Sequence, residues 1–230
     1  MLRKILIVED ERAIRKFIRI NLERENFQVL EAESGEEALE LAGREDPDLV
    51  VLDLMLPGIP GYRVCELLRQ KDPDLGIIML TAKSQDMDKI MGLEYGADDY
   101  MTKPFNPKEL ILRIESLLRR MPKKESQEDR LLSFGPFRLK DYSKTFYKGD
   151  RKIGLTPTEY KLIELFMENP GRAFSRDELL DLVWDYDFIG DTKIVDVNIR
   201  RLRSKIEEDP GKPVYIETVW GVGYRWKKKD

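Results

Sequence analysis

The chain has 230 residues, of which 41% are apolar and 37% charged, and its formal net charge is −4. This composition predicts a globular protein of two domains, and no apolar stretch approaches the length of a membrane span. Because the chain contains no histidine and one cysteine, it has no Ser-His or Cys-His nucleophile pair, no histidine metal ligand and no internal disulfide.

Residues 1–120 alternate strand and helix patterns five times. The expected strands are KILIV (4–8), FQVLE (27–31), LVVLD (49–53), IIMLT (77–81) and DYMTK (99–103). Between the first two strands, Ile14, Phe17, Ile18 and Leu22 have the spacing of one buried helix face. The alternation predicts an α/β fold in which helices cover both faces of a five-stranded, doubly wound parallel sheet.

Two helix starts in this region carry recognisable capping residues. Ser34 precedes Glu37 by three residues, which predicts a capping box for the second helix. Asn106 is suited to cap the last helix of the domain, with Pro107 at its first position.

Polar residues lie at the carboxyl ends of four of the expected strands: Glu9 and Asp10, Asp53, Thr81, and Lys103. With the strand order 2-1-3-4-5, the three carboxylates meet at the point where the order reverses, which is where open α/β sheets bind ligands. Mg²⁺ would relieve the repulsion between the carboxylates. A metal ion, a hydroxyl and an ammonium around one carboxylate predict a phosphoryl site with Asp53 as the nucleophile. For any one of these residues alone, an ordinary strand-end polar cap is the more common explanation.

Residues 121–130 (MPKKESQEDR) are polar and lack periodicity, which predicts a linker. Residues 131–230 change character, with short strands expected near 132–134, 137–139, 145–148 and 152–154 and helices near 157–168, 176–183 and 192–208. A hairpin pattern follows at 214–226. We therefore expect an α+β domain that ends in a β-wing. The net charge is −6 over residues 1–120 and +2 over the rest, which hints at different partners for the two halves.

The last expected helix has one apolar face and one basic face. Its buried face is predicted to hold Val195, Ile199, Leu202 and Ile206. The opposite face would present Lys193, Val197, Arg200 and Ser204, flanked by Arg201. Arginine suits guanine edges and phosphates, and an apolar side chain can meet a thymine methyl. The helix fits a DNA major groove, although most arginine-rich helix faces are simply solvated.

The chain resembles a known family, the two-component response regulators of the OmpR/PhoB type. Residues 1–120 resemble a flavodoxin-like receiver domain through VED, DLMLPG, LTA, GADDY and TKPF, and residues 131–230 resemble a winged-helix DNA-binding domain through LTPTEYKLIELF, VDVNIRRLRSKIE and TVWGVGYRW. The resemblance implies that a sensor histidine kinase phosphorylates Asp53. It also implies Mg²⁺ binding by Glu9, Asp10, Asp53 and the carbonyl of Met55, phosphoryl contacts from Thr81 and Lys103, a cis Lys103-Pro104 bond, and a switch role for Tyr100.

The resemblance further implies a homodimer on activation, formed by the fourth helix, the fifth strand and the fifth helix of the receiver. Its apolar patch would comprise Ile90, Leu93 and Ile111. Its ion pairs would join Lys89 to Glu109, Asp99 to Arg113, and Asp98 to Arg120. Glu115 departs from the family, which usually has a basic partner there for the acid at Glu94.

For the second domain the resemblance implies binding to direct-repeat DNA, with the helix in the major groove and the wing in the neighbouring minor groove. The DNA contacts expected are Asn198, Arg200, Arg201, Arg203, Thr218 and Tyr224, with Trp184 and Lys193 on phosphates. Trp220 stands where many members have arginine, and it either packs against the sugar-phosphate backbone or stiffens the wing. Asn198 replaces the commoner histidine. RNA polymerase is an expected partner, and the protein is expected to be cytoplasmic, with no signal peptide and no membrane contact.

Two other functions compete with a phosphorylation-switched regulator. A Mg²⁺-dependent aspartyl-phosphatase also uses a strand-end aspartate, but it requires a second aspartate two residues later, where this chain has Met55. A regulator that binds DNA without phosphorylation would have no need for the complete acidic site. The chain is accordingly expected to be no enzyme beyond its own phosphotransfer and dephosphorylation.

Overall fold

A computed structural model describes residues 2–82, 95–121, 131–140, 143–184 and 192–228. The chain divides into two compact units, Met1–Leu118 and Arg119–Asp230. Within the described ranges, no helix has both the length and the apolar character needed to cross a lipid bilayer.

The first unit is built on a parallel sheet of five strands: β1 (Lys4–Val8), β2 (Gln28–Ala32), β3 (Leu49–Asp53), β4 (Gly76–Ala82) and β5 (Asp99–Lys103). Their order is β2-β1-β3-β4-β5, which confirms the predicted fold and strand order. The predicted bounds are right for β1, β3 and β5. The second strand begins one residue later than predicted, and β4 is one residue longer at each end.

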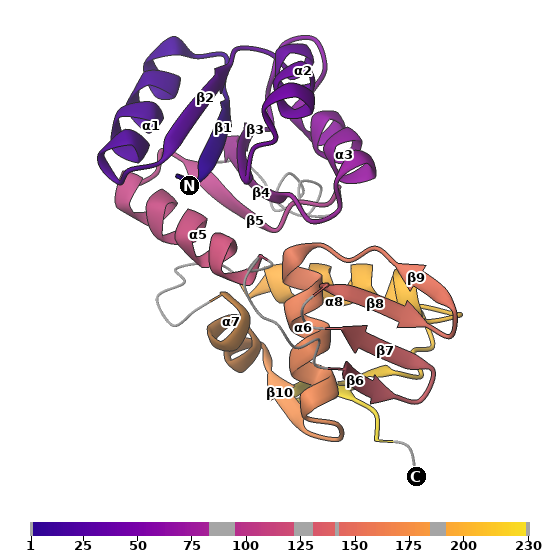
Figure 1. Ribbon diagram of the computed structural model, residues 1–230. Helices are drawn as coiled ribbons and strands as arrows, with labels where there is room; N and C mark the ends of the chain where they lie inside the picture. The colour runs from indigo at the N-terminus through magenta and orange to yellow at the C-terminus, as the bar shows by residue number, and fades with distance from the viewer. Residues whose placement is uncertain (1, 83–94, 122–130, 141–142, 185–191, 229–230) are drawn as a thin grey trace. The chain divides into compact units, whose positions relative to one another are not determined.

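Helices cover both faces of this sheet, namely α1 (Arg12–Arg24), α2 (Gly35–Glu45), α3 (Gly61–Lys71) and α5 (Pro107–Arg120). The first and last of these lie on one face, and α2 and α3 lie on the other (Figure 1). Ile5, Val51 and Leu80 of the sheet pack with Ile18 and Ile114 in one buried cluster. All five residues of β3 are buried, which explains its uninterrupted apolar sequence before Asp53.

Both predicted helix caps are present, one of them in a modified form. Ser34 Oγ accepts a hydrogen bond from the amide of Glu37 at 3.2 Å. The Glu37 carboxylate binds the amide of Glu33 rather than that of Ser34, so the predicted capping box is only half formed. Asn106 Oδ1 accepts from the amide of Lys108 at 3.0 Å, and Pro107 is the first residue of α5.

The second unit begins with an antiparallel sheet of four strands in chain order: β6 (Leu131–Phe134), β7 (Phe137–Lys140), β8 (Thr145–Lys148) and β9 (Arg151–Ile153). The helices in the described part of this unit are α6 (Pro157–Glu168), α7 (Arg176–Trp184) and α8 (Lys193–Ile206). A second sheet has the order β10-β12-β11 and consists of β10 (Ala173–Ser175), β11 (Ile216–Val219) and β12 (Gly223–Trp226). The predicted wing is the β11–β12 hairpin, whereas β10 was not predicted.

An aromatic cluster joins the two sheets of the second unit. The ring of Phe137 lies 5.4 Å from that of Phe146 and 5.3 Å from that of Trp226, measured between centroids. Phe137, Phe146 and Trp226 are each at most 1% exposed. Large buried rings contribute much of the hydrophobic stabilisation of a small domain, so this cluster fixes strand β12 of the wing to the body of the unit.

Candidate functional site

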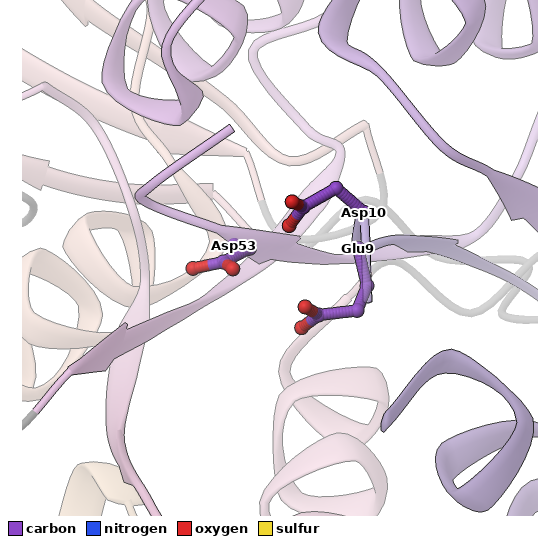
Figure 2. Close-up of side chains that lie close together, drawn as sticks. All are labelled: Glu9, Asp10 and Asp53. Carbon is purple, nitrogen blue, oxygen red and sulfur yellow. The ribbon is translucent and has the colours of Figure 1, made fainter. Parts of the chain in front are cut away.

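Three carboxylates gather at the carboxyl ends of β1 and β3, two neighbouring strands of the parallel sheet. Glu9 and Asp10 directly follow β1, and Asp53 is the last residue of β3. One oxygen from each of the three lies within 4.8 Å of the others, as Figure 2 illustrates. Glu9 and Asp53 are buried, while Asp10 is exposed. The convergence predicted from the strand order is therefore present.

Lys103, at the end of β5, is the positive group of this acidic site. Its Nζ lies 2.7 Å from Asp53 Oδ2 and 2.6 Å from Glu9 Oε2. Burial alone would lower the pKa of Lys103, but the two carboxylates outweigh burial and raise it. Burial and the charge of Asp53 together raise the pKa of Glu9, against the effect of Lys103.

The charges of the site fit a divalent metal ion. Three carboxylates and one ammonium leave an excess of negative charge at the edge of the sheet, and two of the carboxylates are almost fully buried. Oxygen ligands of this kind suit Mg²⁺, which is bound in proteins by one or two carboxylates and retains several waters. Glu9, Asp10 and Asp53 are therefore placed to hold such an ion.

The loop after β3 supports Asp53 and leaves the site open on one side. The amide of Met55 donates to Asp53 Oδ1 at 3.1 Å, and the Met55 side chain is 69% exposed. A pocket of about 480 Å³ is lined by Asp10, Leu54, Met55, Leu56, Pro57, Pro60 and Tyr62. Because Asp10 belongs to both the pocket and the acidic cluster, the pocket leads to the carboxylates of the site. The predicted metal contact of the Met55 carbonyl stays a prediction.

The two remaining predicted residues of the site, Thr81 and Tyr100, lie on β4 and β5. Thr81 is 3% exposed and Tyr100 is 9% exposed, so both side chains are buried in this conformation. The Lys103-Pro104 peptide bond is cis, as predicted. The predicted phosphoryl contact of Thr81 and the switch role of Tyr100 stay predictions.

One supporting residue of the site was not predicted from the sequence. The Nη1 atom of Arg15 donates to the backbone oxygens of Glu9, at 2.6 Å, and Asp10, at 3.3 Å. Arg15 is 6% exposed, whereas Phe17, predicted to be buried, is 45% exposed. The available signal was the spacing of Arg15, Ile18 and Leu22 by three and four residues. The predicted burial of Phe17, which rested on its spacing from Ile14, Ile18 and Leu22, is therefore wrong.

Gly61, the first residue of α3, lies directly behind Asp53. A Cβ atom added there would stand 1.9 Å from the carbonyl oxygen of Asp53 and 2.9 Å from the Cα of Leu54. These are backbone atoms that cannot move without displacing Asp53 and the loop that follows it.

Replacing Gly61 by alanine is therefore expected to lower the free energy of unfolding by about 1–3 kcal/mol and to slow labelling by a phosphodonor. Denaturant unfolding and a labelling time course measure the two effects. Gly43→Ala is the matched control, since its Cβ would meet only the tip of Lys71. That helix-interior change should stabilise the chain by roughly 0.5–1 kcal/mol. Equal effects from both substitutions would refute the close approach at Gly61.

Most of the described residues of the predicted dimer surface are already paired within the chain. Arg113 Nη1 lies 2.9 Å from Asp99 Oδ1, and its Nη2 lies 2.6 Å from Glu109 Oε1. The opposing carboxylates outweigh burial and raise the pKa of Arg113. One of the three predicted pairs, Asp99 with Arg113, is therefore made inside one chain in this conformation, where Glu109 also pairs with Arg113.

Asp98 is not available as a surface group, contrary to the prediction. It is completely buried, where it pairs with Arg69 and accepts a hydrogen bond from the amide of Ile77 at 3.0 Å. Its predicted partner Arg120 is the last residue of α5. Ile111 is half-buried against the receiver core. The other predicted dimer residues, Lys89, Ile90 and Leu93, lie outside the described residues, as does Glu94, the expected partner of the position at Glu115.

The predicted DNA-binding helix forms as α8, and its apolar face is as predicted. Val195, Ile199, Leu202 and Ile206 are each at most 1% exposed. Lys193, Arg200 and Ser204 are exposed on the other side. Val197, predicted to be exposed, is only 7% exposed, so the buried surface of the helix is wider than one face.

Three of the predicted DNA contacts are contradicted in this conformation by burial or by internal pairing. Asn198 is fully buried, and its Nδ2 donates to the carbonyl of Ile194 at 2.9 Å. Trp184 is 1% exposed, so its side chain cannot reach a phosphate. The guanidinium of Arg201 lies 3.0 Å from the buried carboxylate of Glu159 and is 12% exposed. It therefore faces the interior rather than a groove.

Three further predicted DNA residues, Arg203, Thr218 and Tyr224, make hydrogen bonds that connect the wing to α8. Arg203 donates to the carbonyl of Ile216 at 2.7 Å and to Thr218 Oγ1 at 2.9 Å. The hydroxyl of Tyr224 donates to Asp196 Oδ1 at 2.8 Å. Trp220, at the tip of the hairpin, is 91% exposed. The geometry of the wing relative to the helix is thus fixed by side-chain hydrogen bonds.

Each of the two units matches a known protein family. Residues 5–115 match the family described as "Response regulator receiver domain", and residues 150–226 match "Transcriptional regulatory protein, C terminal". The chain is 46% identical to the alkaline phosphatase synthesis transcriptional regulatory protein PhoP of Bacillus subtilis, over 98% of this chain and 97% of that one.

Two solved structures are similar along the whole chain. A mutant of RitR has a TM-score of 0.78 and 30% identity, and the alignment covers 99% of this chain and all of that one. The response regulator DrrB, described as an OmpR/PhoB homologue from Thermotoga maritima, has a TM-score of 0.53 and 35% identity over the same shares.

Proposed function

Because this chain belongs to the OmpR/PhoB family of two-component response regulators, we propose that it is a transcription regulator switched by phosphorylation of Asp53. The observation that carries the proposal is the buried carboxylate of Asp53, which lies 2.7 Å from the ammonium of Lys103 and beside the carboxylates of Glu9 and Asp10. Its partners are a sensor histidine kinase and double-stranded DNA. The proposed location is the cytoplasm.

The chemistry is a phosphoryl transfer to the carboxylate of Asp53. An oxygen of Asp53 forms a bond to phosphorus while the bond from phosphorus to the imidazole nitrogen of the kinase breaks, and the imidazole leaves. A Mg²⁺ ion held by Glu9, Asp10, Asp53 and the Met55 carbonyl would supply positive charge for the phosphoryl oxygens. Lys103 supplies a second positive charge, and Thr81 donates a hydrogen bond to the phosphoryl group.

The response to phosphorylation joins the two units functionally. A phosphoryl group adds negative charge and acceptor oxygens at Asp53, and Thr81 and Tyr100 then reorient. The receiver dimerises through its α5 and β5 surface, and two winged-helix domains bind a direct repeat, where they contact RNA polymerase. On DNA, Lys193, Arg200 and Arg203 of α8 are the basic groups best placed for phosphates and bases. The chain turns over no external substrate.

Metal removal tests the phosphoryl site. Incubation of the full chain with acetyl phosphate and Mg²⁺ is expected to add one phosphoryl group per chain, at Asp53. Chelation of the metal should reduce labelling at least tenfold. Mass spectrometry counts the phosphoryl groups, and a binding assay on duplex DNA should show tighter binding after labelling. Sustained hydrolysis of phosphate monoesters over many turnovers would instead support a phosphatase.

A further inference from the structure

Glu9 and Asp10 are consecutive residues that direct their carboxylates to the same place. Each offers an oxygen that lies within 4.8 Å of the other and of an oxygen of Asp53 (Figure 2). Consecutive side chains of an extended strand point to opposite faces of the sheet. The convergence therefore requires the backbone to bend directly after β1, and the chain does bend at Asp10. The geometry of the acidic site depends on what holds this bend in place.

The guanidinium of Arg15, from the first turn of α1, is bonded to the bend. Its Nη1 donates to the carbonyl oxygen of Glu9 at 2.6 Å and to that of Asp10 at 3.3 Å. At the other edge of the guanidinium, Nη2 pairs with Glu33 and Nε lies 3.6 Å from Glu31 Oε2. The side chain is buried. Because a guanidinium is planar and is bonded here at both edges, it holds the two consecutive carbonyls in one arrangement.

The charge of Arg15 and its hydrogen bonds have opposite effects on a metal ion at the site. A positive charge beside three carboxylates repels a second cation, although Glu31 and Glu33 partly offset it. If charge were its whole effect, removal of Arg15 would tighten the binding of any divalent ion. The hydrogen bonds favour the ion, since they fix the backbone that carries two of its ligands. The sign of the change on substitution therefore tells the two effects apart.

We propose that Arg15 is a positioning residue that gives the acidic site its preference for Mg²⁺ over Ca²⁺. This inference rests on the proposed function, because it requires that Glu9, Asp10 and Asp53 hold a metal ion. Mg²⁺ demands a nearly octahedral arrangement of oxygens at about 2.0–2.1 Å, whereas Ca²⁺ accepts irregular arrangements at about 2.3–2.6 Å. A bend held in one conformation suits Mg²⁺, and a loosened bend still serves Ca²⁺.

Competition for bound Mn²⁺ measures both affinities on the full chain without a phosphodonor. Free Mn²⁺ is followed by its paramagnetic resonance signal while Mg²⁺ or Ca²⁺ displaces the bound ion. Arg15→Met removes the donors and keeps an unbranched side chain, and it is expected to weaken Mg²⁺ binding about 10- to 100-fold, the usual cost of losing a group that orients a metal ligand. Ca²⁺ binding should weaken much less, so the ratio of Mg²⁺ affinity to Ca²⁺ affinity falls.

Arg15→Lys separates geometry from charge. Lysine keeps the positive charge but has a single nitrogen, which cannot bond the carbonyls and the carboxylates at two edges as the guanidinium does. The affinity ratio should fall in this variant too, by less than in Arg15→Met. A smaller folded fraction lowers the affinity for both ions by the same factor and leaves the ratio unchanged, so destabilisation alone does not produce this result.

The matched control is Arg19→Met, one turn further along α1. Within the described residues, the guanidinium of Arg19 pairs with Glu31, at 3.2 Å, and with Glu23, at 3.5 Å. This variant should keep the wild-type affinity ratio. An unchanged ratio in Arg15→Met, or tighter binding of both ions, would overturn the inference and leave the proposed function standing. A wild-type chain that binds Ca²⁺ as tightly as Mg²⁺ would also overturn the inference, and one that binds neither ion would overturn both.

Discussion

A full chain carrying asparagine at position 53 is expected to take up no phosphoryl group from acetyl phosphate and Mg²⁺. The amide is close in shape to the carboxylate, so its oxygen still accepts from the amide of Met55, but it is no nucleophile. Lys103 keeps its pair with Glu9, whose Oε2 lies 2.6 Å from Nζ. The fold should therefore survive while the chemistry is lost.

The measurement is the mass of the intact chain after labelling, followed by mapping of the modified peptide. Asp10→Asn is the matched control, because it changes a neighbouring carboxylate that is exposed and not the nucleophile. That variant should still be labelled, at a higher Mg²⁺ requirement. Labelling of Asp53→Asn at the wild-type rate would place the phosphoacceptor elsewhere. The binding assay on duplex DNA should show no response to phosphodonor in Asp53→Asn.

A second large effect is expected at Glu159, far from the acidic site in sequence. Glu159 is fully buried, where its carboxylate lies 3.0 Å from Arg201 Nη2 and 2.5 Å from Lys205 Nζ. The same carboxylate accepts from the amide of Thr156 at 2.9 Å and so completes the capping box of α6. Glu159→Gln should lower the free energy of unfolding by about 3–5 kcal/mol, because it leaves charges uncompensated in the interior. Urea unfolding measures the loss.

The control is a second helix cap with a glutamate, at the start of α7, which is exposed to solvent. Glu178 caps α7 in the same way, with its carboxylate 2.8 Å from the amide of Ser175, but it lies at the surface. Glu178→Gln should change the free energy of unfolding little, because water can hydrate Arg172 once its ion pair with Glu178 is lost. A loss as large as that of Glu159→Gln would contradict this explanation, because it would show that burial of the carboxylate does not cause the loss.

The pH dependence of stability follows from the same carboxylate. Burial alone would raise the pKa of Glu159, but Arg201, Lys205 and the Thr156 amide outweigh burial and lower the pKa below its ordinary value of 4.5. The unfolded chain thus binds this proton at a higher pH than the folded one. The stabilisation is present above pH 4.5 and is lost as the pH falls through the folded pKa. Glu159→Gln should therefore show a smaller loss of stability in acid than the wild-type chain.

The acidic site was predictable because strand periodicity determines which residues end each strand. Parallel strands bring their carboxyl ends to one edge, so Glu9, Asp53 and Lys103 had to converge once the strand order was known. Arg15 was not predictable in its role. It donates hydrogen bonds to backbone oxygens of the loop that it supports. Every residue has such an oxygen, so the sequence of the loop does not predict these contacts.

In the second unit, sequence periodicity did not predict contacts between residues that are far apart in the chain. A helical repeat identifies one buried face, and it did so for Val195, Ile199 and Leu202 of α8. The repeat cannot reveal that Arg201, on a flank of α8, forms an ion pair with the buried Glu159 of α6. The short strand β10 was missed for a similar reason, since its three residues pair with β12 far along the chain.

The intrachain pairs of Arg113 bear on how two receivers would recognise each other. Asp99 and Glu109 already neutralise this arginine before any partner arrives. Association through that surface is then an exchange, in which each ion pair gained across the interface replaces one broken within a chain. Such an exchange contributes little net free energy, so apolar contacts must supply the affinity. What the charges retain is selectivity, since a partner without the same three residues could break the pairs but not remake them.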